Sequence, residues 1–311
     1  MDRIKLKVGR IGYLNVLPVY YPLEHGYLSH NFSFVYGSPA ELNEAIRKGK
    51  LHLSVVSSIE YARHHERYLI LPDLSISARG KVKSVLLLSR ISLKHCSSSP
   101  VVHTTPQSHA SVALADILLR EIFELECNFV TCARPLWQTK RYSPDSPEIY
   151  LAIGDEALYW AKKGFFPHVY DLGELWTQWT GKPFVFALWV CRKEVAKRFK
   201  KLVTKGARLL TNAKRLGLEN LDEAIKQAAR TSFLTSSELK DYFSTLSYRL
   251  GDDEIDGLLL YFAYLVKHGI ITKIPPVQIL NIGRGDGRER YKYTNEKVFQ
   301  GEFGKNSHIP A

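Results

Sequence analysis

The sequence predicts an α/β fold in which short strands alternate with helices and form a mostly parallel sheet. Two turns near the start of the chain, each leading from a predicted strand into a predicted helix, are the evidence for this fold class. The alternating run at residues 5–8 leads into a glycine-containing turn at residues 12–18, and the apolar run at residues 51–56 leads directly into Ser57 and Ser58. In open α/β sheets, ligands bind at such turns, beyond the carboxyl ends of the strands.

The length and composition are those of a globular protein. The chain has 311 residues, enough for two α/β lobes, of which 45% are hydrophobic and 24% are charged. No run reaches the roughly 18 apolar residues of a membrane span, and residues 1–7 lack the apolar stretch of a secretory signal. The four cysteines, Cys96, Cys127, Cys132 and Cys191, include no C-x-x-C pair. We therefore expect a cytoplasmic protein without a disulfide framework, a zinc site or a membrane partner.

The formal net charge is +12, which raises nucleic acid and anionic small molecules as possible partners. The lysines and arginines are spread along the chain, with modest clusters at residues 192–205 and 284–292. Neither cluster carries a recognisable nucleic-acid-binding module. We therefore expect a small-molecule ligand and no nucleic-acid partner.

The first ninety residues contain further strand and helix signals. Ser38 and Glu41 form a capping box at the start of a predicted helix. Residues 71–77 have turn chemistry and are expected to form a loop. Strands are predicted at residues 31–36 and 83–89, and the second is so apolar that we expect it to be buried on both faces.

The remainder repeats the pattern and then becomes helical. A polar connector at residues 96–100 ends in proline and is a candidate lobe boundary. Gly154 is predicted to make a tight turn from a strand into a helix. Strands are predicted at residues 101–104, 128–131, 149–153 and 183–190. Helices are predicted at residues 194–210, 221–229, 238–246 and 253–268.

Asn15 precedes Leu17 and Pro18, which is typical of a helix N-cap. On this segment alone, a cap is the simpler interpretation. The alternative is a ligand contact, because the residue follows the carboxyl end of a predicted strand.

The turn at residues 105–111 contains Thr105, Ser108 and Ser111 before a helical stripe. Hydroxyl groups and free N–H groups at a helix N-terminus suit a carboxylate or a phosphate, although plain capping explains them equally well. Other polar residues predicted at strand ends are Ser57, Ser58, Ser84 and Asp155. No nucleotide motif, serine-hydrolase elbow, metalloprotease motif or cysteine cage is present, so no cofactor and no metal are expected.

Several stretches together resemble one family, chorismate dehydratase of the futalosine route to menaquinone. The stretch at residues 171–187, with its Trp-Thr-Gly-Lys-Pro-Phe-Val-Phe-Ala block, is the most specific. The other matching stretches, in the same order, are residues 8–18, 57–62, 71–76, 82–85 and 153–155. The resemblance is strong over roughly the first two thirds of the chain and loose over the helical remainder.

The resemblance implies a two-lobed fold like that of type II periplasmic binding proteins, with the substrate in the cleft and a C-terminal helical extension. Residues 1–90 would begin lobe 1 and residues 91–183 would form lobe 2. Residues 184–311 would return to lobe 1 and add helices and a flexible tail. The strands at residues 82–89 and 184–191 would be the crossings between lobes.

The resemblance also implies the reaction, in which chorismate loses water to give 3-[(1-carboxyvinyl)oxy]benzoate. Asn15 and Ser84 fall on catalytic positions of the family, Asn15 near the departing hydroxyl and Ser84 at a carboxylate or hydroxyl. Ser108 to Ser111 fall on a carboxylate-binding turn. Ala110 stands where the family has threonine, so one hydroxyl is missing from that turn. Ser57, Ser58, Thr105 and Asp155 complete the expected substrate-binding set.

Two other functions remain possible from the sequence, and each can be distinguished from chorismate dehydratase. A sister enzyme that makes 1,4-dihydroxy-6-naphthoate has a similar fold, but its Pro-Asn-Asp-Thr turn is absent here. A non-catalytic binding protein for an aromatic carboxylate would hold its ligand unchanged.

Overall fold

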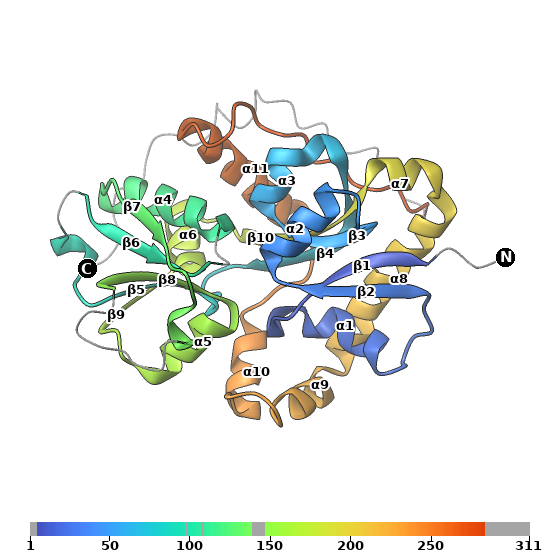
Figure 1. Ribbon diagram of the computed structural model, residues 1–311, viewed down its shortest axis with the longest axis horizontal. Helices are drawn as coiled ribbons and strands as arrows, with labels where there is room; N and C mark the ends of the chain where they lie inside the picture. Colours follow the sequence, from blue (N-terminus) through green and yellow to red (C-terminus); the bar gives the residue numbers. More distant parts are fainter. Residues whose placement is uncertain (1–4, 97–98, 107–108, 139–146, 284–311) are drawn as a thin grey trace.

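The computed structural model describes residues 5–96, 99–106, 109–138 and 147–283, and these residues form two five-stranded sheets. Figure 1 shows the first sheet, mostly blue, on the right and the second sheet, mostly green, on the left. Each sheet is covered by helices. The expected flexible tail, residues 284–311, lies outside the described residues.

The first sheet has the strand order β2-β1-β3-β10-β4. Its strands are β1 (Leu6–Ile11), β2 (Phe32–Gly37), β3 (Leu53–Ser57), β4 (Tyr68–Ala78) and β10 (Phe184–Arg192). β1 runs parallel to β2 and β3, whereas β10 runs antiparallel to both β3 and β4. The prediction of a mostly parallel sheet was therefore wrong, because this sheet and the second sheet both have as many antiparallel as parallel pairings. The late strand returns from the other lobe in the opposite direction.

The second sheet has the strand order β7-β6-β8-β5-β9. Its strands are β5 (Val85–Ser89), β6 (Val101–Thr104), β7 (Asn128–Thr131), β8 (Ile149–Ile153) and β9 (His168–Asp171). β6 is parallel to β7 and β8, and β5 is antiparallel to β8 and β9. β5 is buried along its whole length, as its apolar run predicted.

The chain passes between the sheets twice. It leaves the first sheet after Ala78 and enters the second at Val85, and it returns to the first sheet at Phe184. The first crossing therefore consists of residues 79–84. It precedes β5, which is itself a strand of the second sheet and not a crossing. The second crossing, residues 172–183, likewise precedes β10, so the prediction of a crossing strand at residues 184–191 was also wrong. The lobe limits at residues 90 and 183 stay a prediction.

The expected loop at residues 71–77 lies inside β4, so that prediction was wrong. β10 pairs with Ile70 and then with Ser75, and the residues between them bulge out of the ladder. Pro72 has no N–H to donate, and Asp73 has a positive φ of 52°. The turn chemistry is real, but the neighbouring strand continues past it.

Helices follow most strands in the first two thirds of the chain. They are α1 (Leu17–Glu24), α2 (Pro39–Arg47), α3 (Ser58–His64), α4 (His109–Phe123), α5 (Gly154–Lys163) and α6 (Leu172–Thr180). The capping box predicted for α2 is confirmed, because Ser38 Oγ accepts the Glu41 N–H and the Glu41 carboxylate accepts the Ser38 N–H.

The last third is helical, as predicted. Its helices are α7 (Lys193–Arg198), α8 (Lys200–Glu219), α9 (Leu221–Ala228), α10 (Ser236–Ser244) and α11 (Asp252–Lys267). α9 and α10 share a small apolar cluster with Leu158 of α5, and in Figure 1 they lie below the two sheets. The extension therefore contacts both lobes.

No helix in the described ranges is both long enough and apolar enough to cross a membrane. All four cysteines are free thiols.

Candidate active site

A cavity of about 100 Å³ lies between the two sheets, beside the first crossing. Its walls come from the carboxyl ends of β1, β3 and β8, from the first crossing and from the start of β10. The polar residues that line it are Tyr13, Asn15, Asn43, Ser57, Ser58, Ser84 and Ser111. The remaining lining is apolar apart from Gly154.

Asn15 lies in a 3-10 turn, Leu14–Val16, between β1 and α1. It caps no helix, because Tyr13 and Val16 occupy the N-cap positions and neither helix start has a side-chain cap. The cap interpretation was therefore wrong. The Asn15 Oδ1 atom is buried and has no hydrogen-bond partner, while the Asn15 carbonyl accepts the Tyr248 hydroxyl at 2.7 Å. The backbone of Asn15 is fixed, and its carboxamide oxygen is unpaired.

Ser84 ends the first crossing and is 3% exposed. The Tyr242 hydroxyl of α10 donates to Ser84 Oγ at 3.1 Å, and the Ser84 carbonyl accepts the Gly154 N–H at 2.7 Å. Lys83, directly before it, has a positive φ of 60°, which is uncommon for a residue other than glycine. Such strained backbone gathers at functional sites.

The Asp171 carboxylate holds this strained segment. It accepts the N–H groups of Val82 and Lys83 at distances down to 2.7 Å, and those of Gly173 and Glu174 at the start of α6. Burial raises the pKa of Asp171 from its ordinary value, and these four N–H groups counteract the rise. One carboxylate therefore ties the first crossing to the second sheet.

Three of the other predicted serines also reach the cavity. Ser57 is the N-cap of α3, with its Oγ accepting the Glu60 N–H at 3.3 Å, and Ser58 follows it. Ser111 lines the opposite side from the first turn of α4. The structure thus brings Asn15, Ser84 and these three residues together.

The other two hydroxyl positions do not join this group. Thr105 is buried and its side chain is hydrogen-bonded to the Glu156 carboxylate, outside the cavity lining. Ser108 lies outside the described residues.

Asp155 lines an adjacent hollow of about 340 Å³ that shares Ile11, Tyr13 and Ile153 with the cavity. Its Oδ1 accepts the Leu14 N–H at 3.3 Å. Burial raises the pKa of Asp155 to about 6, and the Leu14 N–H and the Arg10 charge limit the rise. This carboxyl group therefore changes charge near neutral pH.

Gly154 brings Asp155 close to Tyr13. Its φ is +60°, and a Cβ atom built there would lie 3.0 Å from the Tyr13 ring. The prediction of a tight turn here is confirmed. Burial, together with the carboxylates of Asp155 and Glu156, raises the pKa of the Tyr13 hydroxyl, so Tyr13 stays neutral.

The sequence-based prediction missed four residues of this site. Tyr13 lines the cavity after β1, and Asn43 lines it from the middle of the amphipathic helix α2. Tyr242 and Tyr248 support Ser84 and Asn15 from behind. These two supporting tyrosines are more than 150 residues away along the chain, so no local pattern relates them to the site.

The cavity walls are electrically neutral. No Asp, Glu, Lys, Arg or His is among the described residues that line it. The described part of the chain also contains no group of three or more residues suited to hold a metal ion. An anion bound here would be held by hydroxyl, carboxamide and backbone N–H groups.

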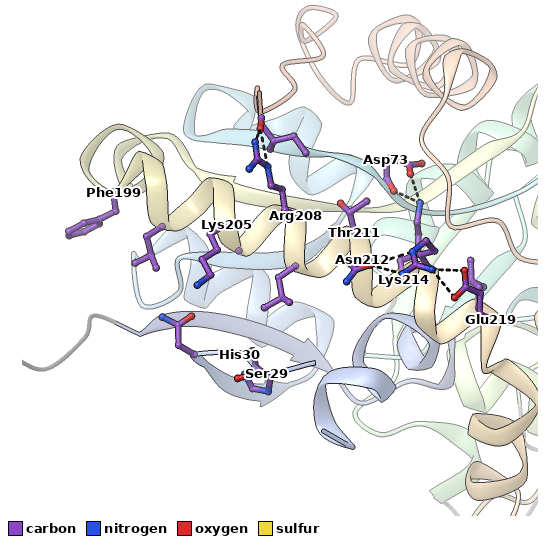
Figure 2. A pocket seen from close by; sticks show the side chains of 17 residues that line it. Ser29, His30, Asp73, Phe199, Lys205, Arg208, Thr211, Asn212, Lys214 and Glu219 are labelled. Atoms are coloured by element: carbon purple, nitrogen blue, oxygen red, sulfur yellow. Dashed lines mark hydrogen bonds and ion pairs between the residues drawn. The ribbon is translucent and has the colours of Figure 1, made fainter. Parts of the chain in front are cut away.

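A larger open groove of about 1430 Å³ runs along α8, beside the segment that leads into β2 (Figure 2). Three of its cations already have partners. Lys214 Nζ lies 2.6 Å from the Asp73 carboxylate, Arg215 pairs with Glu219, and Arg208 donates to the carbonyl oxygen of Ile282. The groove has no strand ends in its walls, and we assign it no chemistry.

A model of the menaquinone biosynthesis family matches residues 6–267. The chain belongs to the menaquinone biosynthesis family. Two relatives of known name agree with this membership. The chorismate dehydratase of Thermus thermophilus is 32% identical over 256 residues, which are 76% of this chain and 88% of the relative. The chorismate dehydratase of Campylobacter jejuni is 31% identical over 208 residues, 63% of this chain and 75% of the relative. The resemblance seen in the sequence is confirmed.

Solved structures show the fold of this menaquinone biosynthesis family member. An Archaeoglobus fulgidus protein superposes with a TM-score of 0.68 at 17% identity, covering 87% of this chain and all of that structure. The periplasmic aliphatic sulphonate binding protein of Escherichia coli gives 0.60 at 14% identity, covering 96% and 100%. The predicted periplasmic-binding-protein-like fold is confirmed.

Proposed function

We propose that this protein is a chorismate dehydratase, a hydro-lyase that converts chorismate to 3-[(1-carboxyvinyl)oxy]benzoate and water. The observation that carries the proposal is the pair of Asn15 and Ser84 in one cavity. Membership of the menaquinone biosynthesis family, with relatives named chorismate dehydratase, supports it.

The reaction requires little acid–base chemistry from the protein. The ring C3–H is acidified through the diene that joins it to the ring carboxylate. Its proton and the C4 hydroxyl leave together as water, and the electron pair of the C3–H bond completes an aromatic ring. Aromatisation therefore drives the elimination.

The neutral cavity suits a reaction in which the substrate supplies its own base. The described lining residues include no side chain that would accept a proton at neutral pH. The enolpyruvyl carboxylate of chorismate can reach the C3 hydrogen. Holding the substrate in that conformation is an orientation effect worth up to about 7–11 kcal/mol in favourable cases.

Asn15 and Ser84 take the catalytic positions in this proposal. The Asn15 carboxamide hydrogen-bonds the departing hydroxyl or the developing charge, a role in which one donor contributes about 3–4 kcal/mol. Ser84 donates to a substrate oxygen, and Ser57, Ser58 and Ser111 bind the carboxylates. Asp155 borders the substrate from the adjacent hollow.

Asn15→Ala tests this assignment. The variant should fold normally, because the Tyr248 hydroxyl bonds the backbone and not the side chain. It should lose most of its turnover, at least about a hundredfold in kcat. Purified protein is mixed with chorismate, and the products are followed by chromatography and mass.

The outcomes separate the alternatives. A product lighter by one water, with aromatic ultraviolet absorption, supports the reaction. Chorismate that is bound but recovered intact would indicate a binding protein for aromatic carboxylates. Wild-type rates in Asn15→Ala would overturn the role of Asn15.

We propose the cytoplasm as the compartment. The four free cysteines support a reducing environment.

A further inference from the structure

Two carboxamide oxygens in the cavity have no hydrogen-bond partner. In the described part of the chain, four buried side-chain atoms lack a partner: Asn15 Oδ1, Asn43 Oδ1, His103 Nδ1 and Trp176 Nε1. Only the two asparagines also line the cavity. A buried polar group left without a partner costs about 1–3 kcal/mol, so both sites call for an explanation.

α2 holds Asn43 in a fixed position. Pro39 and Asn43, one helical turn apart, both line the cavity, while Leu42 and Ile46 point into the core with at most 1% exposure. The capping box fixes the start of the helix, and the Arg47 guanidinium donates to the Asn43 carbonyl at 3.3 Å. The carboxamide is therefore presented by a rigid element.

The chemistry of the ligand decides how the two carboxamides are used. Chorismate carries two carboxylates, which only accept hydrogen bonds, and one hydroxyl, which can donate. That hydroxyl can satisfy one asparagine oxygen. The second carboxamide can bind the dianion only by turning its amino group toward a carboxylate.

We propose that Asn43 is a second substrate-binding carboxamide, whose amino group donates to one carboxylate of the substrate. This inference rests on the proposed function, in which Asn15 faces the hydroxyl. Because no Lys or Arg is among the described lining residues, neutral donors must hold each carboxylate, and the loss of one is not compensated by a nearby cation.

Asn43→Asp tests the proposal with almost no change of shape. It replaces the donating amino group by a second acceptor oxygen, so KM for chorismate should rise at least about tenfold, with kcat within about threefold of the wild-type value. The control is Asn212→Asp on α8, which introduces the same charge into the outer groove and should leave KM unchanged.

A pH series separates binding from a structural role. Acid protonates the introduced carboxylate of the Asn43→Asp variant and so restores a donating O–H. The KM of the variant relative to wild type should therefore fall back as the pH is lowered toward about 4. A KM ratio near one at every pH, or a loss confined to kcat, would overturn the proposal. Thermal unfolding of both variants checks that the fold is intact.

Calorimetry keeps this inference distinguishable from the proposed function. Wild-type protein that leaves chorismate unchanged would overturn the function. In that case, wild type and Asn43→Asp are each titrated with the dicarboxylate 3-[(1-carboxyvinyl)oxy]benzoate and with the monocarboxylate benzoate, and the two affinities decide the role of Asn43. Weaker binding of the dicarboxylate by Asn43→Asp, relative to wild type, supports the role, and equal binding overturns it.

Discussion

At the residue scale, hydrogen bonds from behind fix the direction in which Ser84 can act. Tyr242 donates to Ser84 Oγ, so the Ser84 hydrogen must point elsewhere, and the other acceptor within reach among the described residues, the Val82 carbonyl, lies at a long 3.4 Å. A substrate oxygen in the cavity is a better acceptor. Tyr242 itself is fully buried and is a positioning residue, since it touches the serine and not the cavity.

Tyr242→Phe should therefore act only through Ser84. Without the tyrosine donor, the serine hydrogen is free to turn away from the substrate. The value of kcat/KM should then fall about five- to tenfold, because one neutral hydrogen bond typically contributes a factor of this size. Ser84→Ala should lose more, and adding Tyr242→Phe to it should cost no further activity. Steady-state kinetics of the four proteins checks this. Additive losses would contradict the coupling.

The raised pKa of Asp155 predicts a pH effect on binding. Below its pKa of about 6 the acid is protonated and neutral, and above it a carboxylate faces a dianionic substrate. KM for chorismate should therefore rise as the pH increases through this value, because the two charges repel. Asp155→Asn, which stays neutral, should keep a low KM from about pH 5 to pH 8. A wild-type KM that is flat over this range would rule the effect out.

At the element scale, the first crossing depends on a cap that belongs to another element. Asp171 is the N-cap of α6, yet it also binds Val82 and Lys83, so one side chain ends β9, starts α6 and holds the segment that carries Ser84. Lys83 is held further by an ion pair with Asp241 of α10. The strained φ of Lys83 persists because several elements fix it.

Asp171→Ala should destabilise the protein more than an ordinary cap loss. Four N–H groups, two of them buried and two partly buried, lose their acceptor, so the free energy of unfolding should fall by about 2–4 kcal/mol. Ser38→Ala, which removes the exposed cap of α2, should cost about 1 kcal/mol. Urea denaturation measures both. Equal values for the two variants would show that Asp171 is only a cap.

The elements also show what local sequence can and cannot reveal. The strands at residues 83–89 and 149–153 were predictable because their apolar patterns are local. Residues 71–77 were not, because pairing with β10, more than 100 residues later, overrides the turn chemistry. The segment around Asn15 favoured a cap because the same residue type serves both roles, and only the family resemblance pointed to the site. Asn43 could not be predicted because it lies in a regular amphipathic helix without a distinguishing motif. Tyr242 could not be predicted because its role depends on a tertiary contact alone.

At the scale of the whole molecule, the positive charge and the neutral cavity are separate features. The net charge of +12 is carried outside the cavity lining, where it can attract an anionic substrate without holding it in one place. Residues of both sheets and of the helices that follow their strands line the site, and the charged surface supplies the long-range field.

A higher ionic strength should therefore weaken the attraction of the substrate to the protein and leave the rate of the chemical step unchanged. Raising salt from about 20 mM to about 300 mM shortens the screening length several-fold, so KM should increase by a few-fold while kcat stays constant. Sucrose at equal osmolarity is the control and should change neither constant. A KM that does not change with salt concentration would show that the surface charge plays no part in substrate binding.

The strand order of the first sheet has a consequence for how the protein is made. β10 lies between β3 and β4, yet it is synthesised only after the entire second sheet. Until then, the first sheet consists of the three strands β2, β1 and β3 and the separate strand β4, and the edges that β10 will join are unpaired. The second sheet can close first, and the first sheet can close only late in translation. A ribosome that stalls before residue 184 would release a chain with both edges open to aggregation.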